Sequence, residues 1–373
     1  MGMLIINYDE ERNCMMWKAE KKIIARKVPA KSLIISEDGI LSLVGRKEFY
    51  AIGKLEDLPG IVEYEKTGIP DIKIGTTDLA VPIQFCFNVQ DDPETVLIAR
   101  EHGFSLVVDY RKESFSIRNL ADLSLCLTGY AGEYLPDCIY TGGIVDSKGR
   151  LWMTLIDGSG ELERLEESQG YLCVVESIDG NWKLTHIKAE ECPFGAICLS
   201  LDEKTMYTSN FRLTKIMAWD FDINACTLSN QRVFMQLENF VEWPMALVMD
   251  TEQHIWCAVF NGQKIIRIDP QGKIVGVVYL SSVEPVAFEF FGHDLIILTT
   301  AGLEDLDMSP NPGVITPEEL SYKGHVYRVR VGYTGKPKRS YKHVESASGS
   351  GSRSRSASGS ASGSVLGSAA ESN

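Results

Sequence analysis

The sequence predicts an all-β fold, specifically a six-bladed β-propeller followed by a disordered Ser/Gly-rich C-terminal tail. Three observations support this prediction. Apolar, β-branched or aromatic runs separated by turn residues follow one another from residue 30 to residue 340, as expected for strands bounded by turns. One turn-and-strand unit recurs six times in that region. Helical periodicity is almost absent from it, which disfavours an α/β architecture.

The recurring unit is an acidic or glycine-containing turn followed by an apolar strand. Its copies are SEDGILSLV, QDDPETVLIA, DSKGRLWMTL, LDEKTMYTS, DTEQHIWCAV and GHDLIILTT, marked by Asp38, Asp91, Asp146, Asp202, Asp250 and Gly292 at intervals of 53, 55, 56, 48 and 42 residues. Spacing near 50 residues is typical of four-stranded propeller blades. Two smaller β-sandwiches are the alternative, but the regular spacing and the lack of a linker before residue 340 favour the propeller.

Three parts of the chain follow from this pattern. Residues 1–29 form an N-terminal segment whose LIINY run at 4–8 suits a ring-closing strand, and residues 30–340 form the propeller. Residues 341–373 form the tail, in which 12 of the 29 residues from 345 onward are serine. Such a composition buries too little apolar surface to offset chain entropy, so we expect disorder there. The serines beside Arg353 and Arg355 are the best phosphorylation candidates in an otherwise passive tail.

The charge balance excludes several partners. With 37 Lys+Arg against 51 Asp+Glu, the net charge is −14, which argues against a nucleic-acid partner and against docking on anionic lipid. No apolar run reaches the length of a transmembrane helix and the N-terminus lacks a signal-peptide pattern, so we expect no membrane partner and a cytoplasmic location. The expected partner is an unknown small molecule or protein, and the expected state is a monomer or a weakly associated dimer.

Nine cysteines are scattered through strand-like runs. They form no CxxC pair and no Cys/His grouping with zinc spacing. Buried, reduced thiols are the expected state. The six histidines are also dispersed, and no Gly-x-Ser-x-Gly motif or phosphate-binding glycine loop is present, so neither serine-hydrolase nor nucleotide chemistry is indicated.

Four segments carry a family likeness. They are GGIVDSKGRLWMTLID (142–157), PFGAICLSLDEKTMYTSN (193–210), AWDFDINACTLSNQRVF (218–234) and WPMALVMDTEQHIWCAVFNGQKIIRIDPQGKIV (243–275). From about Cys138 to Pro337 the chain resembles the senescence marker protein, gluconolactonase and regucalcin family. The resemblance implies a six-bladed propeller that hydrolyses lactones with one divalent metal, often calcium or zinc, at the mouth of the central channel. In that chemistry the metal polarises the carbonyl and a carboxylate helps to deliver water.

The residues that the resemblance would assign to the site are different in this chain. The family's metal-binding Asn corresponds to Phe194, its Asp ligand and base to Met245, its first-blade Glu to about Ala30, its substrate-contacting Asn and Arg to Thr141 and Ile139, and the Asp after the next strand to Asn210. Phenylalanine cannot bind a metal, and a thioether is too soft for calcium. There are three interpretations: apolar side chains that plug the channel mouth, an apolar pocket for a different ligand, and a relocated metal site.

Two functional hypotheses follow. The first is a catalytically degenerate relative that acts as a binding or interaction module, with no catalytic residue and no cofactor expected. The second is a metal-dependent sugar-lactone hydrolase or calcium-binding protein with a displaced site, for which Glu191 and Glu242 are the fallback ligands and calcium or zinc the metal. The loss of the family ligands favours the first, because fold likeness does not carry function when site residues differ.

Overall fold

A computed structural model gives the architecture of the chain. It describes residues 7–9, 14–18, 22–24, 30–45, 49–56, 83–100, 103–111, 115–122, 138–157, 170–178, 181–190, 194–210, 213–280, 285–299 and 326–343. Every regular element in these ranges is a β-strand, so the all-β prediction is confirmed. Within the same ranges no helix is long and apolar enough to span a bilayer.

The strands form six sheets. Three sheets are built from four consecutive strands each. The first contains β7 (Ile83–Val89), β8 (Asp92–Arg100), β9 (Gly103–Val108) and β10 (Ser116–Asp122). The second contains β11 (Cys138–Val145), β12 (Leu151–Asp157), β13 (Gly170–Ile178) and β14 (Asn181–Glu190), and the third contains β15 (Phe194–Leu199), β16 (Thr205–Asn210), β17 (Lys215–Asp222) and β18 (Thr227–Gln236). The others contain β23 (Pro285–Phe291), β24 (Asp294–Thr299), β25 (Val326–Arg330) and β3 (Lys22–Ile24); β19 (Trp243–Met249), β20 (Ile255–Phe260), β21 (Lys264–Ile268), β22 (Ile274–Tyr279), β2 (Cys14–Lys18) and β1 (Asn7–Asp9); and β4 (Ala30–Ile35), β5 (Ile40–Gly45) and β6 (Phe49–Lys54).

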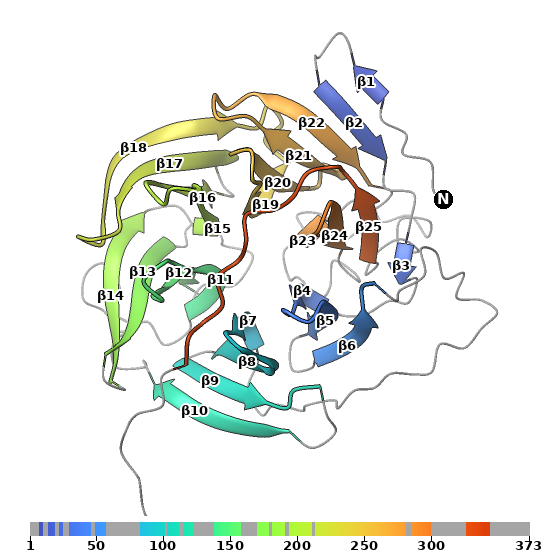
Figure 1. Ribbon diagram of the computed structural model, residues 1–373. Helices are drawn as coiled ribbons and strands as arrows, with labels where there is room; N and C mark the ends of the chain where they lie inside the picture. Colours follow the sequence, from blue (N-terminus) through green and yellow to red (C-terminus); the bar gives the residue numbers. More distant parts are fainter. Residues whose placement is uncertain are drawn as a thin grey trace, which may run out of the picture.

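The sheets are arranged radially around a centre, as Figure 1 shows. The first strand of each sheet is innermost, and these strands neighbour one another in the order β4, β7, β11, β15, β19, β23 and again β4. The propeller arrangement is therefore confirmed. Five sheets have the four or more strands of a complete blade, where six complete blades were predicted, because the β4–β6 sheet has three strands within the described ranges.

The six repeat residues of the sequence all lie in the turn between the first and second strand of a sheet. Two of these turns use the same buried contacts. Asp146 accepts hydrogen bonds from the Arg150 and Trp152 side chains at 2.7 and 2.9 Å. Asp250 accepts from the Trp256 indole at 3.0 Å and from the Arg267 guanidinium at 2.9 Å. The acidic residue of the repeat therefore fixes the turn to the second strand.

The N-terminal segment supplies strands to two sheets. β3 pairs antiparallel with β25 as the outermost strand of its sheet. The β1–β2 hairpin pairs with β22 through β2, in a parallel arrangement. There the Trp17 ring packs 5.7 Å from Trp256 and over Gly276, where a Cβ would lie only 2.6 Å from the ring. Of the LIINY run, residues 4–6 lie outside the described residues, and β1 begins at Asn7.

After β25, residues 331–343 form a segment that we call the C-terminal strap. It runs across one side of the ring from β25 to the β7–β10 sheet (Figure 1). The Lys336 amide donates to the Met249 carbonyl at 2.7 Å, and the Tyr341 amide donates to the Asn88 carbonyl at 2.8 Å. Because Tyr341 is buried, the predicted tail boundary at residue 341 is too early. Residues 344–373, where disorder was predicted, lie outside the described residues.

The hydrophobic core lies between neighbouring sheets. Trp152 of β12 packs edge-on against Phe221 of β17 with ring centroids 5.1 Å apart, and both belong to one buried cluster that joins two sheets. Four of the five cysteines whose side chains are described are buried, and none of the five is in a disulfide. Inter-sheet packing of this kind holds the inner strands in place around the centre.

Candidate functional site

The two sides of the ring carry different parts of each sheet. The strap contacts the turns that join first and second strands, including Gln90, Ser200 and Thr251. We call that side the turn face. Because each sheet is built up-and-down, the inner strands begin on the opposite side, which we call the start face. Five of the positions predicted from the family resemblance lie at or near the beginnings of inner strands, so they belong to the start face. The sixth, Asn210, ends β16 and lies on the same side, because it pairs with Phe194.

Every inner strand has a pairing irregularity close to its beginning. The breaks fall at Ala30/Ser32, Ile83/Phe85, Tyr140/Gly142, Phe194/Ile197, Pro244/Ala246 and Pro285/Ala287. A β-bulge of this kind leaves the extra residue unpaired and redirects its side chain. Thr141 and Met245 are themselves the unpaired residues, while Ala30 and Phe194 border a break. The ring of bulges therefore coincides with the predicted site positions.

Thr141 uses its hydroxyl to join two sheets. The hydroxyl donates to the Phe194 carbonyl oxygen at 2.8 Å, and Thr154 beside it donates to the Gly195 carbonyl oxygen at 2.6 Å. The close approach depends on Gly142, where a Cβ would lie 3.0 Å from the same Gly195 oxygen. Thr141 thus ties β11 to β15.

Phe194 lies in the core. Its side chain is 3% exposed and belongs to the cluster formed by Trp152, Trp219 and other residues of the two neighbouring sheets. In the strand register it pairs with Asn210, which is 7% exposed. The Asn210 side-chain oxygen accepts the Leu213 amide at 2.9 Å. Thr141, Phe194 and Asn210 are therefore brought together, but as a packed and hydrogen-bonded joint.

Met245 lies on the next inner strand, β19. It is half-buried and packs against the cluster that includes Leu33, Phe260 and Val286. Ala30 begins β4, where it pairs with Gly45, and Ile139 pairs with Ile156 in β11. The side chains of Ala30 and Ile139 lie outside the described residues.

One of the two fallback carboxylates is paired with a lysine. Glu242 forms an ion pair with Lys264 at 2.8 Å, and Glu191 lies outside the described residues. Within the parts of the chain that the structure describes, no three His, Cys, Asp or Glu residues come together as a metal site would require. The side chains of Phe194 and Met245 offer no oxygen ligand, so the described residues at the start face do not fit calcium or zinc.

Apolar side chains are exposed at the same face. Phe240 and Val241, in the connection that leads into β19, are 76% and 58% exposed, and Leu213 in the β16–β17 turn is 43% exposed. The Leu237 amide donates to the Thr214 carbonyl at 2.9 Å and links these two loops. The start face thus presents apolar groups beside the bulged strand ends.

Comparison with known proteins places the chain in a family. Residues 67–301 match the family described as SMP-30/Gluconolactonase/LRE-like region. This match covers more than half of the chain, which therefore belongs to that family of propellers.

Individual relatives agree with this placement. The chain is similar to regucalcin of Oryctolagus cuniculus, with 30% identity over 257 residues, covering 67% of this chain and 81% of the relative. It is 26% identical to regucalcin of Xenopus laevis over 204 residues, covering 54% of this chain and 65% of the relative. Among solved structures, a luciferin-regenerating enzyme aligns with a TM-score of 0.67 and 18% identity, over 87% of this chain and 99% of that one. A regucalcin of Agrobacterium tumefaciens, titled a calcium-binding protein, aligns with 0.65 and 16%, over 88% and 99%.

The sequence did not reveal the bulges or the strap. One signal for a bulge was visible: the glycines in YTGGIV (140–145) and PFGA (193–196) permit close backbone approach inside strands. The anchoring of the strap had a weaker signal, the basic run KPKR at 336–339 in an acidic protein. Both features depend on contacts between segments far apart in the chain.

Proposed function

We propose that this protein is a catalytically degenerate member of its family, a propeller that acts as a binding or interaction module. The observation that carries the proposal is the position of Phe194. The Phe194 side chain is 3% exposed and is part of an inter-sheet cluster, so a polar metal-binding side chain at this position would disrupt the core. Met245, half-buried against the next cluster, supports the same conclusion. Without hard oxygen ligands at these two positions, the described residues do not supply the charge stabilisation on which metal-assisted hydrolysis depends.

The proposal includes the completion of the ring. The β4–β6 sheet is taken as the sixth blade, because β4 lies between β23 and β7 and carries the same early bulge as the other inner strands. β3 is taken as the strand that closes the ring, since it joins the beginning of the chain to the last sheet. A cytoplasmic location is part of the same proposal.

The proposed partner is a protein or an apolar small molecule that binds at the start face. Phe240, Val241 and Leu213 supply exposed apolar contacts there. Exposed apolar groups that gather beside a polar rim are typical of binding surfaces. The net charge of −14 disfavours an acidic partner.

Metal content and lactone hydrolysis test the proposal together. We expect no stoichiometric divalent metal by elemental analysis after equilibration with calcium, and no hydrolysis of sugar lactones. A relative that retains the family ligands, prepared in parallel, is the positive control. One tightly bound metal per chain, or hydrolysis that a chelator abolishes, would contradict the proposal and favour the lactonase or calcium-binding alternative.

A further inference from the structure

A buried carboxylate lies on the turn-face side of the ring, away from the start-face site. Glu289 is on the inner strand β23 and is 7% exposed. Burial raises the pKa of the Cys86 thiol on β7 to about 12, and Lys338 and Glu289 both act on that thiol, lowering and raising its pKa respectively. Cys86 itself is buried in the cluster between the β4–β6 and β7–β10 sheets.

A small cavity adjoins this carboxylate. It measures about 200 Å³ and is lined by Val248, Glu289 and Phe290 of the propeller and by residues 334–338 of the strap. Within the described residues, Glu289 Oε2 accepts no well-aligned hydrogen bond; the nearby charge is the Lys338 ammonium at 2.8 Å. A charged group in such surroundings needs a partner of opposite charge.

Lys338 is placed there by a strap that is anchored elsewhere. The Lys336 side chain donates to the Ser200 carbonyl at 2.8 Å, and the Arg339 guanidinium pairs with Glu203 at 2.9 Å. Tyr341 is buried and stacks on Trp182, with ring centroids 5.8 Å apart. The Lys338 side chain itself is 54% exposed, so it can leave Glu289 while the strap stays in place.

We propose that Glu289 and this cavity form a binding site for a small primary alkylammonium ion, and that Lys338 is a built-in competitor that occupies the site. The site lies on the opposite side of the ring from the proposed start-face function and is independent of it. The ligand's ammonium group replaces that of Lys338 against Glu289, and its alkyl chain packs against Val248 and Phe290.

The chemistry of the lining selects this class of ligand. A single carboxylate beside Val248 and Phe290 suits one positive charge with an apolar body. The other cation of the lining, Lys336, is held by the Ser200 carbonyl and Glu203. A metal ion would need several oxygen ligands, and no group of three acidic, His or Cys residues exists within the described part of the chain. The four-carbon stem of lysine makes n-butylammonium the closest free mimic of the present occupant.

Removal of the competitor tests the proposal. We would titrate n-butylammonium chloride into the full-length wild type and into Lys338→Ala, following binding by calorimetry and by the rise in unfolding temperature. Sodium chloride at equal ionic strength controls for screening. Because Lys338 occupies the site most of the time, only the small fraction of wild-type molecules with an empty site can bind the ligand. The apparent affinity of the wild type is the intrinsic affinity multiplied by that fraction, so Lys338→Ala should bind n-butylammonium at least about tenfold more tightly.

Two further variants make the result decisive. Lys342→Ala removes the same charge from an exposed strap position and should bind like wild type. Glu289→Gln combined with Lys338→Ala should lose the binding. If Lys338→Ala does not fold, Lys338→Met keeps the stem without the charge and carries the same expectation. Equal affinities in wild type and Lys338→Ala, no binding in either, or binding that survives Glu289→Gln would each overturn the proposal.

Discussion

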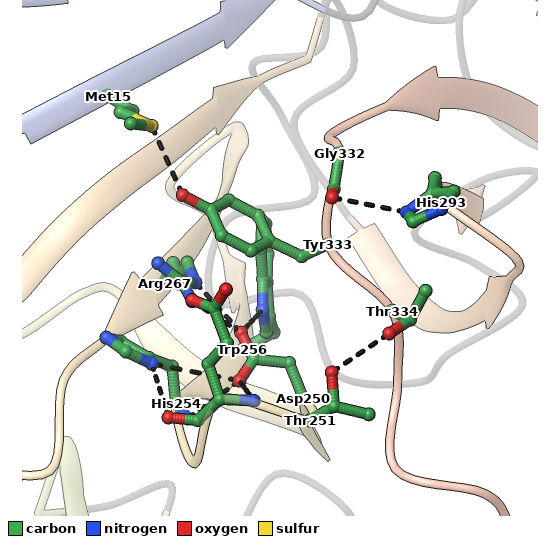
Figure 2. Close-up of polar contacts among 11 residues, drawn as sticks. Met15, Asp250, Thr251, His254, Trp256, Arg267, His293, Gly332, Tyr333 and Thr334 are labelled. Atoms are coloured by element: carbon green, nitrogen blue, oxygen red, sulfur yellow. Dashed lines mark hydrogen bonds and ion pairs between the residues drawn. The ribbon is translucent and has the colours of Figure 1, made fainter.

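At the scale of single residues, the turn aspartates explain why the acidic repeat exists. Figure 2 shows the arrangement around Asp250, which contacts Trp256, Arg267 and the backbone of its own turn. The Arg267 guanidinium also lies 3.6 Å from the centre of the Tyr333 ring, and the Tyr333 hydroxyl donates to Met15 Sδ at 3.3 Å. One carboxylate thus organises a turn, and through Arg267 it is linked to the strap and the N-terminal hairpin.

Asp250→Ala should be strongly destabilising. The substitution leaves Arg267, which is 5% exposed, without its buried partner. Loss of one member of a buried ion pair costs about 3–5 kcal/mol, and urea unfolding followed by circular dichroism measures it. Asp220→Ala is the matched control, because Asp220 pairs with Arg232 at 2.7 Å on the surface, where both side chains are about half exposed. Similar effects for the two variants would show that burial is not the cause.

Phe194→Ala should cost about 3–5 kcal/mol, as expected for a phenylalanine truncated inside a core. Met245→Ala, at a half-buried position, should cost less. Both are measured as changes in the free energy of unfolding. A near-neutral Phe194→Ala would mean that the ring lies in an open mouth instead of in the inter-sheet cluster, and would weaken the proposed function.

At the scale of elements, the strap depends on a charge cluster at Glu203. Burial tends to raise the pKa of Glu203, but hydrogen bonds from Ser147 and Arg339 outweigh it and hold the pKa below its ordinary value of 4.5. Lys336 lies 3.7 Å away on the same carboxylate. The folded state therefore favours the ionised form, and this stabilisation is complete above the ordinary pKa and is lost as the pH falls through the folded-state pKa.

Acidification below pH 4.5 should therefore loosen the strap before the propeller unfolds. The Lys336 and Tyr341 amides, which donate to carbonyls of the propeller, should lose protection from hydrogen exchange, relative to their intrinsic rates, in this range. Glu203→Gln should show the loss already at neutral pH and a flatter pH dependence. Exchange of both amides that stays independent of pH in wild type would contradict this role of Glu203.

At the scale of the whole molecule, segments on either side of the propeller sequence bind the ring. The β1–β2 hairpin and β3 pair with two sheets, and the strap contacts others. These joints are long-range in sequence, so we expect them to form late in folding, after the local hairpins of the sheets.

Deletion of residues 1–24 should lower the unfolding temperature by several degrees. It removes β3 from the β23–β25 sheet and exposes the surface that Trp17 covers, a side chain whose burial is worth about 3–5 kcal/mol. Deletion of residues 344–373 should leave the unfolding temperature unchanged, since the tail is predicted to be disordered. A larger effect from the tail deletion than from the N-terminal deletion would refute this assignment of roles.

The repeat shows how much of the fold was predictable. Asp38, Asp91, Asp146, Asp202, Asp250 and Gly292 all lie in corresponding turns, as their spacing indicated. Turn chemistry and strand alternation are local properties, so they can be read along the chain. For the site, only the positions could be predicted from the sequence. Thr141, Phe194 and Asn210 do come together, but the contacts that their side chains make could not be predicted.

The chain alone determined an all-β propeller of this family, because repeated turns and apolar strands specify the blade unit and the matching motifs identify it. It also predicted that Phe194 and Met245 stand at the positions of family ligands. The tertiary structure decided the rest: that Thr141 joins two sheets, that Phe194 is core, that β2 pairs in parallel with β22, and that Lys338 neutralises Glu289. These outcomes depend on which distant segments meet, and a buried group takes its role from the neighbours that closure of the ring brings to it.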